Sequence, residues 1–184
     1  MKKIISIVLI VGLLTFFSMG NIFAADNDSH AITITVSEIA ELALEDNSPT
    51  VTLAAGLGAG LPGDTVQGDT DSSMRLFYTT LVGVGTKKIT AELGQNISGF
   101  TGLDLTLTAT PAGTGTGTEG LSAGAVNLDA SFGAAVDIIT AIGTCATGRL
   151  GSNGAQLLYT LVIDPATVVQ NTATTTVTLT LLDT

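Results

Sequence analysis

The chain has 184 residues, of which 45% are hydrophobic and only 4% aromatic, and its formal net charge is −10. This acidity excludes nucleic acids and anionic lipid headgroups as favoured partners, because like charges repel. The abundance of Val, Ile, Leu and Thr with sparse charge excludes a disordered chain, in which the balance is reversed.

The first 24 residues have the layout of a secretory signal peptide. Lys2 and Lys3 give a basic start, an apolar run occupies residues 4–17, and small and polar residues precede Ala24. The apolar run is short for a membrane span. We therefore predict that residues 1–24 are removed on export and that the mature chain is extracellular or on the cell surface, not inserted in the membrane.

The remaining residues, 25–184, have the length of one domain with a substantial core. Removal of Lys2 and Lys3 leaves four basic residues against sixteen acidic ones, so the net charge becomes −12. Trp is absent, and the predicted core is aliphatic.

Alternation of apolar and small polar residues dominates this domain and predicts strands with one buried and one wet face. In chain order the predicted strands are residues 31–36, 39–44, 50–54, 74–82, 87–93, 103–110, 126–131, 136–142, 157–163 and 174–182. Ser37 and Glu38 interrupt the first alternation. We favour one bulged strand there, the alternative being a short helix that Ser37 caps.

Two long loops are predicted between these strands. Residues 56–73 are rich in Gly and Asp, and residues 111–120 are a low-complexity Gly/Thr segment expected to be exposed and mobile. About nine short strands with Gly-rich turns and no convincing helix indicate an all-β fold, a single antiparallel β-sandwich of Ig-like or pilin-like type. Leu103–Thr110 is expected to be an internal core strand.

Catalytic chemistry finds little support, and we expect no enzyme. His30 is the single histidine and lies in the short polar segment of residues 26–30. Cys145 is the single cysteine, so it forms no internal disulfide. We interpret it as a small buried residue, the alternative being an intermolecular bridge.

One candidate metal site is present. Asp64, Asp69 and Asp71 occupy one Gly-containing loop, and calcium prefers several oxygen ligands from a loop that wraps around it. The spacing and closing Glu of an EF-hand are missing. We favour a solvated acidic loop, with calcium as the alternative and no other cofactor expected.

Several features together resemble exported, fibre-forming β-sandwich proteins of bacterial surfaces, the pilin-like kind. They are the signal peptide, the opening of the mature chain over Ile32–Ile39, the segment Leu158–Leu161 and the closing segment Val177–Leu181. The chain lacks the paired cysteines and C-terminal aromatic signature of chaperone–usher pilins, which argues against that export route.

The resemblance implies a structural subunit of a filament, pilus-like fibre or surface layer that self-associates by donor-strand addition. Ile32, Ile34 and Val36 are then the docking residues that enter a neighbouring subunit. Two alternatives stay open: residues 31–36 pair within their own sheet, or the protein is an adhesin or binding module, calcium-dependent through the aspartate loop.

Overall fold

The computed structural model of the chain describes residues 31–45, 50–57, 65–94, 102–130, 133–149, 151–169, 172 and 174–184. The predicted signal peptide, His30 and Asp64 lie outside the described residues. The chain divides into two compact units, residues 1–36 and residues 37–184, and each is considered by itself.

The described residues form strands and no helix, which confirms the all-β prediction. No helix that could span a membrane is found among them. The strands are β1 (Ile39–Leu44), β2 (Gly56–Leu57), β3 (Val66–Gln67), β4 (Asp69–Leu81), β5 (Lys87–Leu93), β6 (Leu103–Pro111), β7 (Thr116–Gly117), β8 (Leu121–Ser122), β9 (Ala125–Asn127), β10 (Val136–Ile142), β11 (Cys145–Ala146), β12 (Ala155–Ile163) and β13 (Val177–Asp183).

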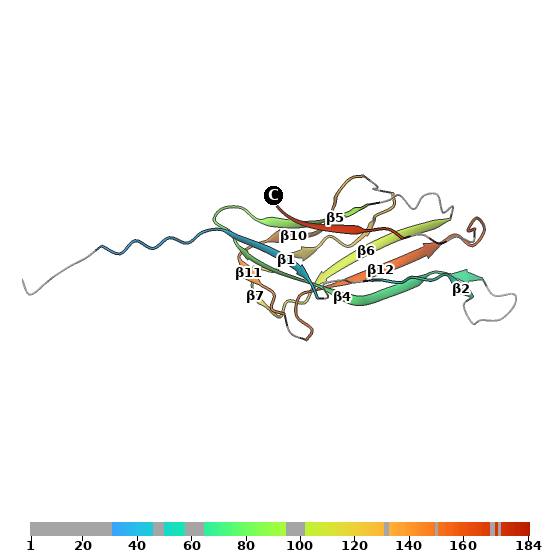
Figure 1. The fold of residues 1–184 in the computed structure, drawn as a ribbon, viewed down its shortest axis with the longest axis horizontal. Helices are drawn as coiled ribbons and strands as arrows, with labels where there is room; N and C mark the ends of the chain where they lie inside the picture. The colour runs from blue at the N-terminus through green and yellow to red at the C-terminus, as the bar shows by residue number, and fades with distance from the viewer. Residues whose placement is uncertain are drawn as a thin grey trace, which may run out of the picture. The chain divides into compact units, whose positions relative to one another are not determined.

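The strands make two larger antiparallel sheets and a small β2–β3 ribbon (Figure 1). The seven-stranded sheet has the order β7-β11-β4-β12-β6-β9, with β1 also paired to β4. The four-stranded sheet has the order β13-β5-β10-β8. This arrangement is consistent with the predicted β-sandwich, whereas its Ig-like or pilin-like type stays a prediction.

The long strand β4 organises the larger sheet. Near its C-terminal end, β1 pairs with it from Ile39 opposite Leu81 to Leu44 opposite Leu76. Its N-terminal half pairs with β12, which pairs in turn with β6. The predicted strand 74–82 is therefore confirmed, although it begins at Asp69 and ends at Leu81.

Side chains from both larger sheets form one aliphatic core. Alternation explains its membership, because residues two apart on a strand share a face. Leu76, Ile89, Leu107, Ile139 and Leu157 are fully buried there, one from each of five strands. Leu107 confirms that residues 103–110 form a core strand, lying between β12 and β9.

Four predicted segments differ from the structure, and one of them is the predicted strand 126–131, where β9 covers only Ala125–Asn127. Residues 31–36 lie in no strand, and neither do residues 50–54, although Val51 and Leu53 pack half-buried against the core. The predicted loop 56–73 holds β2, β3 and the start of β4, because β12 supplies a backbone partner for the polar residues after Gly68. Residues 39–44 form the strand β1 rather than a helix, but the favoured bulged strand is only half confirmed, because residues 31–38 before it lie in no strand.

Candidate assembly surfaces

The segment of residues 31–36 exposes its apolar side chains. Ile32 is 72% exposed, Ile34 81% and Val36 72%. They alternate with Thr33 and Thr35, so in an extended segment all three apolar side chains share one face. We call residues 31–36 the arm. Its pattern is that of a half-buried strand, yet it lies in no strand and none of the described strands pairs with it.

The last strand, β13, pairs with β5 along one edge, and no described strand pairs with its other edge. The Gly94 amide donates to the Thr176 carbonyl at 2.7 Å. At the other end the Thr184 amide donates to the Thr86 carbonyl at 3.1 Å. Antiparallel strands exchange backbone hydrogen bonds at every second residue, so the even-numbered residues of β13 are the ones hydrogen-bonded to β5. The backbone groups that point away from β5 belong to Val177, Leu179, Leu181 and Asp183.

The first strand, β1, shows the same division. The Glu45 amide donates to the Arg75 carbonyl at 2.9 Å, which assigns the odd-numbered residues of β1 to β4. The even-numbered residues, Ala40, Leu42 and Leu44, therefore direct their backbone groups away from β4. In the described part of the chain no strand pairs with this edge of β1.

These two unpaired edges approach each other, one from each larger sheet. The side chains beside them pack against the core but stay half-buried, namely Leu42 and Leu44 on β1 and Val177, Leu179 and Leu181 on β13. We call the facing edges of β1 and β13 the open seam. Apolar side chains that a fully closed core would bury completely are left partly in solvent there.

A buried lysine joins the two edges at one end of the seam. The Lys87 side chain is 5% exposed, and its Nζ lies 2.6 Å from Glu38 Oε1 and 2.5 Å from Asp183 Oδ1. These two carboxylates, that of Asp183 first, raise the pKa of Lys87 above its usual value. The residue before β1 is thereby held beside the last residue of β13.

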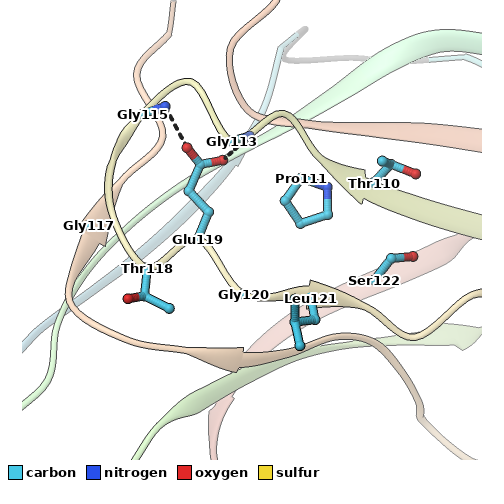
Figure 2. A pocket seen from close by; sticks show the side chains of 10 residues that line it. All are labelled: Thr110, Pro111, Gly113, Gly115, Gly117, Thr118, Glu119, Gly120, Leu121 and Ser122. Atoms are coloured by element: carbon cyan, nitrogen blue, oxygen red, sulfur yellow. Dashed lines mark hydrogen bonds between the residues drawn. The ribbon is translucent and has the colours of Figure 1, made fainter.

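The Gly/Thr segment 111–120 is ordered by one carboxylate. Glu119 is 7% exposed, and its two carboxylate oxygens accept the amides of Gly113 at 3.1 Å and Gly115 at 2.5 Å (Figure 2). The segment also contains β7, which pairs with β11. Residues 113, 114 and 116–118 are exposed, as predicted, whereas Glu119 is buried and Thr116–Gly117 form a short strand rather than a loop.

The same segment borders a hollow of about 330 Å³ (Figure 2). Gly120 at its base has φ +92°, and a Cβ there would lie 2.6 Å from the Thr140 carbonyl oxygen. The charged group beside the hollow, the Glu119 carboxylate, is already bonded to loop amides. Figure 2 shows it turned back into the loop, so the hollow lacks a free charged group with which to hold a ligand.

Two buried tyrosines support the larger sheet. The Tyr78 hydroxyl donates to the Glu119 carbonyl at 2.6 Å, and burial raises its pKa well above the usual value. Tyr159 lies opposite Asp71, and burial, with a smaller contribution from the Asp71 charge, raises its pKa to about 12. Both phenols are therefore neutral structural groups at neutral pH.

The candidate calcium ligands are only partly described. Asp69 and Asp71 lie on β4 rather than in a loop. The Asp69 carboxylate accepts the amides of Ala54 at 3.0 Å and Thr70 at 2.8 Å. The hydroxyl and amide of Ser73 donate to Asp71 at 2.7 and 2.9 Å and lower its pKa. With Asp64 outside the described residues, the calcium site stays a prediction.

Cys145 is buried, as expected for a structural residue, and its Sγ lies 3.3 Å from the Thr80 hydroxyl. Across the described ranges, no group of three His, Cys, Asp or Glu side chains is arranged to hold a metal ion. The sequence reasoning missed Lys87 and Glu119. For Lys87 a signal existed, since it shares its alternation with Ile89, Ala91 and Leu93.

Comparisons with known proteins give no relative. No protein-family model, no curated protein and no solved structure matches this chain.

Proposed function

We propose that this protein is an exported structural subunit that polymerises on the cell surface into a filament, pilus-like fibre or layer by strand addition between copies. One observation carries the proposal. The arm has the alternating sequence of a half-buried strand, yet its apolar face is exposed and its backbone pairs with none of the strands that the structure describes.

The energetics of the arm favour an intermolecular partner. Fully burying an Ile or Val side chain is worth about 1.5–3 kcal/mol. Burial of all three apolar side chains of the arm would therefore stabilise a complex by several kcal/mol, because they are exposed in the single chain. Pairing with the sheet edge of a neighbouring copy would bury them and add main-chain hydrogen bonds. A head-to-tail contact of this kind does not close on itself and therefore builds a fibre.

A binding module is the second candidate, and it depends on the calcium loop. The described aspartates, Asp69 and Asp71, are engaged by neighbouring amides and a hydroxyl. No observation on the described residues favours this candidate over the filament subunit.

Polymerisation of the mature chain, residues 25–184, tests the proposal. We expect light scattering to rise with concentration and negative-stain microscopy to show fibres or ribbons. Deletion of residues 26–36 is expected to leave a folded monomer, because the core lies wholly within residues 37–184. A matched control keeps the composition of the arm but rearranges residues 31–36 so that apolar and polar residues no longer alternate. A discrete particle from the unaltered chain, or fibres from the deletion variant, would contradict the proposal.

A further inference from the structure

We infer that the arm of one copy adds to the free edge of β13 in a second copy, antiparallel to β13 and with Ile34 opposite Leu179. This inference rests on the proposed function and specifies its acceptor. The occupant is a second copy of this chain.

The free edge of β13 is unprotected. Proteins usually guard sheet edges with Lys, Pro, bulges or very short strands. The strand β13 contains no Lys or Pro, and its register with β5 has no shift over seven residues. The other ends of the larger sheets are β7, β8 and β9, which have two or three residues each. An open edge of this length is a template on which a partner strand can pair.

The arm matches this edge side chain by side chain. Val177, Leu179 and Leu181 have free backbone groups and half-buried side chains that face the core. An added strand presents its own inward side chains opposite those of its neighbour. The arm supplies three inward residues, and Thr33 and Thr35 then extend the wet face formed by Thr178 and Thr180.

The edge of β1 fits the arm less well. Ala40 there is exposed, and the outward neighbours on that strand are Ile39, Glu41 and Ala43 rather than threonines.

The connection to β1 disfavours pairing of the arm with its own β1. In a hairpin with Ser37 and Glu38 as its two-residue turn, the backbone N–H and C=O of Ile39 would have to bond the arm. Those groups point toward Leu81 on β4 instead. Such hairpins also favour Gly or Asn in the turn. The bond from Glu38 to Lys87 further fixes the residue that would have to turn.

The lysine contact sets the polarity. Lys87 holds Glu38 beside Asp183, so the residue that precedes β1 lies at the Asp183 end of β13. In an open chain of subunits the donor's body must then approach from the Val177 end. An arm that arrives from that end runs antiparallel to β13, which places Ile32 opposite Leu181 and Val36 opposite Val177.

Engineered cross-links test this register. In the proposed pairing Thr33 and Thr180 are directly opposite and not hydrogen-bonded to each other, the position where Cα atoms approach to about 4.5 Å and a disulfide fits. The full mature chain carrying Thr33→Cys and Thr180→Cys is oxidised with oxidised glutathione and examined by non-reducing electrophoresis. We expect a covalent ladder of dimers, trimers and higher species.

The matched control carries Thr35→Cys and Thr180→Cys, which are two residues out of register, and should give roughly tenfold less ladder because the Cα atoms are too far apart for a disulfide. The unaltered chain, with only the buried Cys145, should give no ladder. A ladder from the control pair alone would instead show a parallel pairing or an antiparallel pairing slipped by two residues, and either would overturn the register.

The remaining outcomes separate the two proposals. A cross-linked monomer would show that the arm occupies its own subunit and would overturn the second copy as occupant. Fibres under the microscope with no cross-link from either pair would overturn the β13 acceptor and leave the filament proposal standing. No fibres and no cross-linked species would overturn both.

Discussion

Replacing Ile34 by Asp is expected to abolish assembly while leaving the subunit unchanged. Ile34 is 81% exposed in the single chain, so the substitution removes no packing there and should not change the melting temperature of the monomer. In the assembled state, the same side chain is buried against Leu179 and the core.

The magnitude follows from this difference in burial. Losing the burial of one Ile costs about 2–3 kcal/mol, and a buried carboxylate adds to that cost. At 1.4 kcal/mol per factor of ten, the association constant falls by at least roughly 30- to 150-fold. The critical concentration for polymerisation, measured by light scattering after sedimentation, should rise by the same factor.

Thr35→Asp is the matched control. It introduces the same charge one residue away, on the wet face of the added strand, where a charge costs little. We expect its critical concentration to stay within a few-fold of the original, because its carboxylate remains in water. Equal effects of the two substitutions would refute the reasoning, since charge and not burial would then govern assembly.

Three further predictions concern the subunit itself. The chain has two tyrosines, both buried, so tyrosinate absorbance of the folded protein should be absent at pH 10–10.5 and appear near pH 10 only after denaturation. Because burial raises the pKa of Tyr159 to about 12, this residue alone lowers the stability by about 2 kcal/mol as the pH rises from 10 to 12, and the raised pKa of Tyr78 lowers it further. Ordinary titration of the folded protein would contradict the burial. Lys87→Met should lower the melting temperature at neutral pH, because it removes both ion pairs. Since the folded pKa of Lys87 is raised, the ion pairs contribute fully to stability below pH 10.5, and this contribution is lost above the folded pKa. A difference in melting temperature between the two proteins that persists at the highest pH would argue against the ion pairs. Glu119→Ala should cost about 1.5–3 kcal/mol in urea unfolding, because the amides of Gly113 and Gly115 lose a charged acceptor, and an unchanged midpoint would show that water replaces it.

Alternation of apolar and polar residues predicted the full extent of strands whose two neighbouring strands belong to the same chain. Lys87–Leu93 and Val136–Ile142 were predicted with their exact bounds, because their alternating side chains are buried by the sheet packed against them. The arm has the same alternation and lies in no strand. Alternation assigns faces and does not say which chain supplies the backbone partner.

Other features could not be predicted from local pattern. Asp69 and Asp71 are typical turn residues, yet they lie on β4 because β12 pairs with them. Glu119 is one carboxylate in a low-complexity segment, and its role depends on the fold of that segment around it. Lys87 shares the inward face of β5, and its two partners come from the ends of the domain, Glu38 and Asp183.

Amide hydrogen exchange on β13 tests the central claim most directly. The chain without residues 26–36 is measured alone and with a synthetic peptide of residues 31–36, with the Thr178 and Thr180 amides, already bonded to β5, as internal controls. We predict that the amides of Val177, Leu179 and Leu181 exchange rapidly in the chain alone and become strongly protected when the peptide binds. Unchanged exchange at all three amides with saturating peptide would contradict the account.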